Sequence, residues 1–244
     1  QFRLTPGVGY HDKSTSVMTF GVDQNRGHAV LGSLVWKLAE LVGATVAQLV
    51  ISIVLARILT PADFGIIALV GVFIALANVF VVSGLGTALV QKKTVDSLDL
   101  SSVFFACMGI SAALFASIFL LAPILADFYV RPELALVMRV LAGSMFLTPL
   151  NVVQNALVSR GMLFKRVFVN SSVATLLSGV LGVALTMGGY SLWALVAQQV
   201  SNQFLLSMLL YASVRWRPTF EFSWGRLMGI LSFSWKILAS GLID

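Results

Sequence analysis

The chain has 244 residues, of which 58% are hydrophobic and only 11% are charged, and its mean hydropathy is +0.94. Soluble proteins carry about 25% charged residues, so this composition excludes a soluble globular domain and predicts an integral membrane protein. The net charge of +6 then reflects basic loops that set the orientation of the chain, and it does not indicate nucleic-acid binding. The lone Cys107 and the two histidines of the polar N-terminal segment form no metal or catalytic group, so no cofactor is expected.

The predicted elements are six complete membrane spans and the start of a seventh. Residues 1–29 form a polar segment that we expect to be cytoplasmic and disordered. The spans are expected at residues 31–59, 63–90, 100–126, 134–158, 167–187 and 190–213, since about 20 apolar residues cross a bilayer.

Together the six spans make a transmembrane lobe at 30–213. A basic cytoplasmic connector at 214–226 and the start of helix seven at 227–244 follow, and the chain is expected to be truncated there. The apolar runs are continuous and lack the ten-residue alternation of a membrane barrel, so the predicted fold is all-α.

Basic residues are distributed unequally between the two sides that this span count defines. The N-terminal segment through Lys37 and the loops near 92–93, 160–166 and 215–226 carry twelve Lys and Arg residues. The alternate loops carry three, which are Arg57, Arg131 and Arg139. Cytoplasmic loops carry the excess of Lys and Arg, so we expect the N-terminus to lie in the cytoplasm.

The stretch RILTPADFG at 57–65 connects the first two spans. Thr60 is a favourable N-cap, Pro61 suits the first helical position, and Asp63 follows the cap by three residues, as in a capping box. This pattern indicates the start of a helix at a turn, in preference to a chemical site.

The same region carries a family resemblance. The stretch VLARILTPADFGIIALVGVFIALANVFVVSGLGTALVQKK is followed in order by LAPILADFYVRPELALVMRVLA, NALVSRGMLFKRVF, GYSLWALVAQQV and RWRPTFEFSWGRL. From about residue 30 onward the chain resembles the polysaccharide (O-antigen, colanic-acid-type) flippases. They are the polysaccharide-transport branch of the multidrug/oligosaccharidyl-lipid/polysaccharide exporter superfamily.

The resemblance implies the N-terminal six-helix lobe, plus the start of helix seven, of a two-lobe transporter with 12 or more helices. It implies a transporter rather than an enzyme, with no catalytic residues. The implied cargo is an undecaprenyl-pyrophosphate-linked oligosaccharide, moved between the leaflets of a bacterial plasma membrane by alternating access. Membrane lipid is a further implied partner, and a polysaccharide polymerase and export machinery are candidate partners.

Span four carries a polar stripe that would suit a hydrated path for such a cargo. The stripe falls within an arc of about 80° of the helix and consists of Ser144, Thr148, Asn151, Asn155 and Ser159. Pro149 lies inside the stripe and is expected to kink the helix. Cavity lining and hydrogen bonding between helices are both open interpretations, and Thr148, Asn151 and Asn155 are candidate cargo-binding residues.

Span six carries four amides, which are Gln198, Gln199, Asn202 and Gln203. Amides bind sugar hydroxyls through paired donors and acceptors, but they also join helices within a membrane. We take all four as candidate cargo-binding residues, with helix association as the alternative. Span five differs, because its face of small residues at i, i+4 spacing predicts close helix packing.

Span one holds Lys37, Glu40 and Gln48, which are also candidates. Its segment SLVWKLAELVG at 33–43 is echoed by SFSWKILASGL at 232–242, and the offset of 199 residues aligns Lys37 with Lys236. Six spans between the two segments predict lobes that repeat in parallel about an axis along the membrane normal. Our hypothesis is that Lys37 and Lys236 face one cavity and engage the pyrophosphate, and snorkelling to headgroups is the alternative.

Two other functions compete with this one. A cation-coupled multidrug exporter of the same superfamily needs buried acids, and Glu40 is the only mid-helix candidate in the first six spans. A non-transporting component of a membrane assembly is the second alternative.

Overall fold

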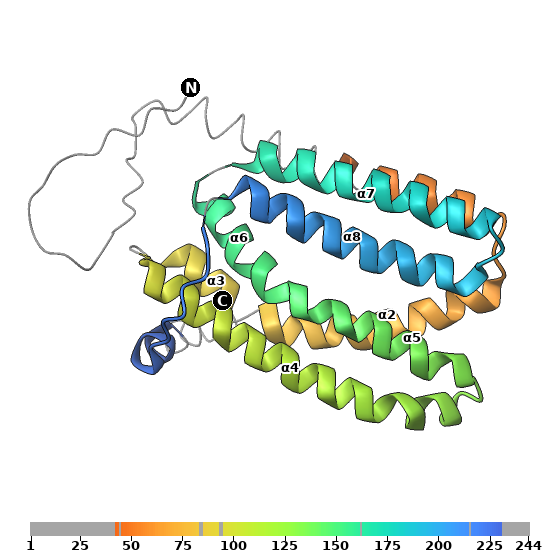
Figure 1. The fold of residues 1–244 in the computed structure, drawn as a ribbon, viewed down its shortest axis with the longest axis horizontal. Coiled ribbons are helices and arrows are strands. Elements are labelled where there is room, and N and C mark those ends of the chain that lie inside the picture. Colours follow the sequence, from red (N-terminus) through yellow and green to blue (C-terminus); the bar gives the residue numbers. More distant parts are fainter. Residues whose placement is uncertain are drawn as a thin grey trace, which may run out of the picture.

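The structure, a computed structural model, describes residues 42–43, 45–82, 85–92, 95–161, 163–214 and 216–230. These residues form helices joined by short turns, with no strand among them, which confirms the all-α fold. The long helices lie side by side along the long axis of the molecule (Figure 1). The expected polar segment at 1–29, Lys37, Glu40 and Lys236 lie outside the described residues.

The helices follow one another in nearly the order that the apolar runs predict. The first described helix is Thr45–Ala56. It is followed by α2 (Pro61–Val82), α3 (Leu85–Gln91), α4 (Ser97–Phe128), α5 (Pro132–Gly143), the 3₁₀ turn η1 (Ser144–Leu147), α6 (Thr148–Arg160), α7 (Phe164–Met187) and α8 (Ser191–Ser213). Residues 224–230 are also helical, so the expected start of span seven at 227 falls inside this helix.

Four helical stretches of the described residues are long and apolar enough to cross a membrane, namely Pro61–Val79, Ser97–Phe128, Pro132–Arg160 and Phe164–Met187. The α8 helix has 23 residues, close to the 24 of α7, and packs along it. The amides of α8 lower its mean hydropathy, so it is not in this group. Composition alone does not distinguish polar residues that face a cavity from those that face lipid.

The fourth expected span is divided. It consists of α5 and α6 with the 3₁₀ turn η1 between them, whereas the second is covered by α2 and α3, with residues 83–84 outside the described ranges. Pro149, at the start of α6, has no N–H to donate and its ring crowds the carbonyl of Met145. The irregularity expected at Pro149 therefore takes the form of a tighter 3₁₀ turn just before it.

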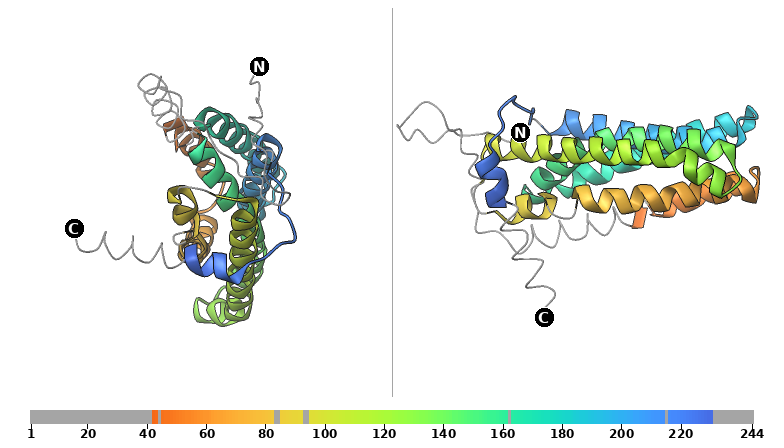
Figure 2. Two further views of the ribbon diagram at one scale, coloured as in Figure 1. Left: turned by 90° about the vertical axis from the view of Figure 1, so that its left-hand side faces the viewer. Right: turned by 90° about the horizontal axis from the view of Figure 1, so that it is seen from below.

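The loops rich in Lys and Arg gather at one end of the bundle, which we call the basic end. It carries α3, the start of α4, the end of α6, the start of α7 and the end of α8 (Figures 1 and 2). The turn before α2, the α4–α5 turn and the α7–α8 turn lie at the other end, which we call the opposite end. The loops thus alternate between the ends as the span count predicts.

The capping box predicted at the start of α2 is confirmed at the opposite end. The backbone N–H of Thr60 donates to Asp63 Oδ2 at 3.2 Å, and the N–H of Asp63 donates to Thr60 Oγ1 at 3.3 Å. The same Asp63 oxygen also accepts a hydrogen bond from Ser191 Oγ at 2.6 Å. Because Ser191 begins α8, this carboxylate joins two helices as well as capping its own.

An ion network at the basic end is centred on Asp99, whose side chain is only 1% exposed. Asp99 lies in the first turn of α4, where its Oδ2 accepts hydrogen bonds from the Asp96 backbone N–H at 3.2 Å and from Lys92 Nζ at 2.6 Å. Arg226 lies 2.8 Å from Asp96 Oδ2 and 3.5 Å from Asp99 Oδ1. The hydrogen bond to Asp96 raises the pKa of Arg226.

The connector after α8 is held against α4 by further contacts. The Thr219 N–H donates to Ser101 Oγ, and the Ser223 N–H donates to Ser102 Oγ, both at 3.1 Å. The ring of Trp216 meets Phe104 edge to face. The extended part of the connector and the helix at 224–230 therefore lie across the basic end (Figure 2).

The small residues of span five bring α7 close to its neighbours, as the sequence predicts. A Cβ added to Gly182 would lie 3.1 Å from Cβ of Gln198 on α8. A Cβ added to Gly179 would overlap the side chain of Ile51, in the Thr45–Ala56 helix. These two glycines allow α7 to pack tightly against helices on either side.

Candidate functional site

A cavity of about 640 Å³ lies within the bundle, and we call it the first cavity. Its walls come from the Thr45–Ala56 helix, α2, the α5–α6 stretch, α7 and α8. Apart from Leu49, Gly71, Ile74 and Leu141, every lining residue carries an amide or a hydroxyl. The volume falls within the range of about 300–1,000 Å³ that is usual for ligand pockets.

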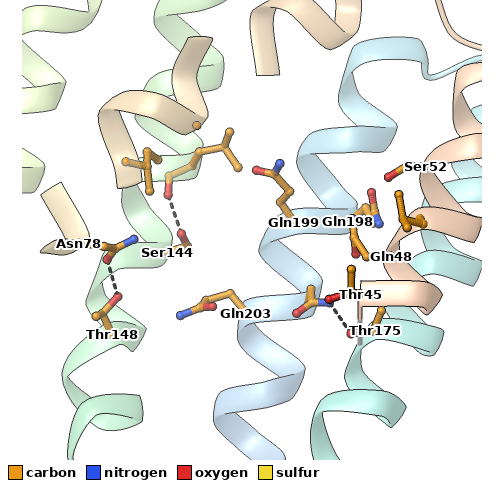
Figure 3. A pocket seen from close by; sticks show the side chains of 15 residues that line it. Thr45, Gln48, Ser52, Asn78, Ser144, Thr148, Thr175, Gln198, Gln199 and Gln203 are labelled. Carbon is orange, nitrogen blue, oxygen red and sulfur yellow. Dashed lines mark hydrogen bonds between the residues drawn. The ribbon is translucent and has the colours of Figure 1, made fainter. Parts of the chain in front are cut away.

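The polar side chains converge on this space from different helices (Figure 3). Gln199 and Gln203 project from α8 toward the wall that carries Ser144 and Thr148. Gln198 lies on the other side of α8, near Gln48 in this view. Because residues on three helices point inward together, the cavity is an organised polar site within an otherwise apolar bundle.

A second cavity of about 490 Å³ continues from the first toward the basic end. The two cavities share Asn78, Thr148 and Gln203 in their walls. The rest of the second wall comes from α3, α6 and α8 and consists of Gly86, Thr87, Val90, Gln91, Asn151, Val152, Asn155, Ala156, Ser159 and Leu206.

A hydrogen bond lies at the junction of the two cavities. Thr148 Oγ1 donates to Asn78 Oδ1 at 3.2 Å, joining α6 to α2. Elsewhere on the walls, Asn202 Nδ2 donates to Ser178 Oγ at 3.1 Å and lies 3.4 Å from Thr175 Oγ1. Asn202 therefore joins α8 to α7 while it lines the first cavity.

No charged side chain of the described residues lines either cavity. Several described cations have partners elsewhere: Lys92 and Arg226 pair with acids at the basic end, and Arg160 donates to carbonyls at the end of α3. Arg139 stacks on the ring of Phe119 at 4.3 Å. The described walls are therefore electrically neutral, with a polar first cavity and a second cavity that mixes amides and hydroxyls with apolar side chains.

The predicted site residues divide into three groups. The first cavity is lined by Gln48, Thr148, Gln198, Gln199, Asn202 and Gln203. The second is lined by Asn151 and Asn155. The remaining candidates, Lys37, Glu40 and Lys236, lie outside the described residues. The structure thus brings together candidates from three separate spans, and their part in cargo binding remains a prediction.

Sequence reasoning missed several wall residues. Asn78 is the most informative, because it is a lone amide in the apolar run of α2 and belongs to no polar stripe. A polar side chain is energetically costly inside a membrane span, so this lone amide could have marked Asn78 as a candidate functional residue. Thr45 and Ser52 lie at helical spacing from Gln48, which could have marked that face of the first span.

Comparison with known proteins decides the family. The model of a family described as polysaccharide biosynthesis protein matches residues 54–244. The chain belongs to this family. The resemblance to polysaccharide flippases that the sequence motifs indicated is thereby confirmed.

Three curated relatives are similar over most of the chain. They are the succinoglycan biosynthesis transport protein ExoT of Rhizobium meliloti, the teichuronic acid biosynthesis protein TuaB of Bacillus subtilis and the lipopolysaccharide biosynthesis protein WzxC of Escherichia coli. Identities are 29% over 212 residues, 24% over 218 and 24% over 202, covering 86%, 88% and 78% of this chain.

The chain spans only 42%, 45% and 39% of these relatives. This coverage fits the expectation that it is part of a larger transporter. No solved structure matches the chain at a significant level.

Proposed function

We propose that the chain forms the N-terminal lobe of a carrier that moves undecaprenyl-pyrophosphate-linked oligosaccharide units across the bacterial plasma membrane by alternating access. The observation that supports this most directly is a polar cavity, joined to a second cavity of mixed lining, inside a bundle with an apolar exterior. Sugar hydroxyls are costly to place in lipid unless they are hydrogen-bonded, so a carrier for them needs such a path.

The relatives support the same assignment. One is named as a succinoglycan transport protein, and the others are named for the biosynthesis of teichuronic acid and lipopolysaccharide. The role proposed for this chain is therefore transport in surface polysaccharide biosynthesis. We assign the basic end to the cytoplasm, since cytoplasmic loops carry the excess of Lys and Arg.

Cation-coupled drug export gains no support from the described residues. Such coupling needs an acid that can bind a proton or a sodium ion in the cavity. Asp99 is the one fully buried acid in the described ranges, and it pairs with Lys92 at the basic end and lines neither cavity.

The test is complementation of a strain that lacks a polysaccharide flippase, with surface polysaccharide as the readout. The full-length gene is expected to restore the polysaccharide, and failure in strains with matching repeat units would contradict the proposal. Gly71 lines the first cavity and has open space around it, so Gly71→Leu is expected to obstruct the cavity and reduce transport. Gly65→Leu is the matched control, because Gly65 also has open space but lies outside both cavities.

A further inference from the structure

Four glutamines line the first cavity, and their side-chain amides make no hydrogen bond to any described residue; we call them the glutamine cluster. They are Gln48, Gln198, Gln199 and Gln203. Other polar residues of the same wall differ, because Asn202 bonds to α7 and Thr148 bonds to Asn78. The amides of the cluster therefore do not contribute to holding the described helices together.

Each primary amide offers two donors and an oxygen with two lone pairs. The amides of the cluster have no protein partner among the described residues, so water or a bound molecule completes their hydrogen bonding. Gln198 is only 4% exposed, Gln203 is half-buried, and Gln48 and Gln199 are exposed. The side chains of Gln199 and Gln203 reach into the space between the helices (Figure 3).

The chemistry of the cluster matches a sugar ring better than an anion. A hydroxyl both donates and accepts, and an amide presents a donor and an acceptor side by side. On binding, a carboxylate would be transferred from water to a wall on which the described residues supply no positive charge. Burial of an unpaired charge is far more costly than burial of a hydrogen-bonded hydroxyl.

We infer that the glutamine cluster is a binding subsite for uncharged sugar rings and that it disfavours acidic sugars. The inference rests on the proposed function, and it narrows the cargo of this lobe to the neutral, hydroxyl-rich part of the molecule. The pyrophosphate is then bound by groups outside these cavity walls.

Binding of two defined probes to the purified full-length protein in detergent tests the inference. Maltotetraose is neutral, and tetragalacturonate has the same number of rings with a carboxylate on each. Titration calorimetry at constant ionic strength is expected to show at least a tenfold preference for maltotetraose. Equal or tighter binding of tetragalacturonate, or no binding of maltotetraose at millimolar concentrations, overturns the inference.

Substitutions then locate the site. Gln199→Leu and Gln203→Leu are each expected to weaken maltotetraose binding by about 3- to 10-fold, which corresponds to loss of one or two hydrogen bonds. Gln154→Leu is the matched control. Gln154 is fully buried with both side-chain polar atoms unpartnered, but it lines neither cavity. Equal loss in the control and the cluster variants counts against the inference.

A reversal of charge preference gives an independent result. Gln203→Lys places a cation in the neutral wall and is expected to raise the affinity for tetragalacturonate at least tenfold, whereas an unchanged preference contradicts the inference. If complementation succeeds while the acidic probe binds better, only the subsite inference fails. If complementation itself fails, the proposed function fails.

Discussion

Removal of the Asp99 carboxylate should measure how strongly the connector and α3 are held at the basic end. Deleting one partner of a buried ion pair costs about 3–5 kcal/mol. Here the side chains of Lys92 and Arg226 are 32% and 40% exposed, so water can solvate both cations after the change. The main loss is then that of a charged hydrogen bond, so Asp99→Ala is expected to lower the free energy of unfolding by about 2–3 kcal/mol.

Asp99→Asn should cost less, about 1–2 kcal/mol, because its side-chain oxygen can still accept from the Asp96 N–H. The assay is unfolding of the full-length protein in mixed detergent and dodecyl sulfate micelles, followed by circular dichroism. Asp127→Ala is the control, since Asp127 is an exposed acid of the same helix. The reasoning is refuted if Asp99→Ala and Asp127→Ala agree within about 0.5 kcal/mol.

Two further perturbations follow from the fold and a third from the sequence. Val130 has a φ of 56°, a left-handed conformation that is unfavourable for a β-branched residue. Val130→Gly should therefore raise the unfolding free energy by about 0.5–1 kcal/mol in the same assay, and a loss would contradict the strain. Gly182→Val should lower it by about 1–3 kcal/mol, because the added Cβ would lie 3.1 Å from Cβ of Gln198, and an unchanged value would argue against close packing. Lys37→Ala with Lys236→Ala should abolish surface polysaccharide in the complementation assay, whereas full activity would exclude the lysine hypothesis.

The fold could be predicted closely because apolar runs mark membrane helices directly. The spans expected at 167–187 and 190–213 correspond to α7 at Phe164–Met187 and α8 at Ser191–Ser213. The division of the fourth span was harder to predict. Pro149 indicates an irregularity there, but not that it takes the form of a 3₁₀ turn at Ser144–Leu147.

The candidate site could be predicted at the level of residue type and helix face only. Periodicity places Asn202 and Gln203 relative to the axis of α8, but it does not tell which neighbour each meets. Asn202 bonds to Ser178, while the side-chain amide of Gln203 meets no partner among the described residues at the cavity wall. Likewise, nothing near Asp99 in the sequence indicates its pairing with Arg226, which follows it by 127 residues.

The hydrogen bond between Asp63 and Ser191 fixes the positions of α2 and α8 relative to each other along the bundle, and both helices line the first cavity. Asn78 follows Asp63 by 15 residues along α2, which is about 22 Å at the helical rise, and Gln203 follows Ser191 by 12 residues along α8, about 18 Å. Both residues lie at the junction of the cavities. The stretch RILTPADFG binds no cargo in this scheme, but its contact with α8 fixes the point from which the positions of Asn78 and Gln203 along their helices are set. An inserted residue in either helix beyond that contact would shift one wall past the other by about 1.5 Å and rotate it by about 100°.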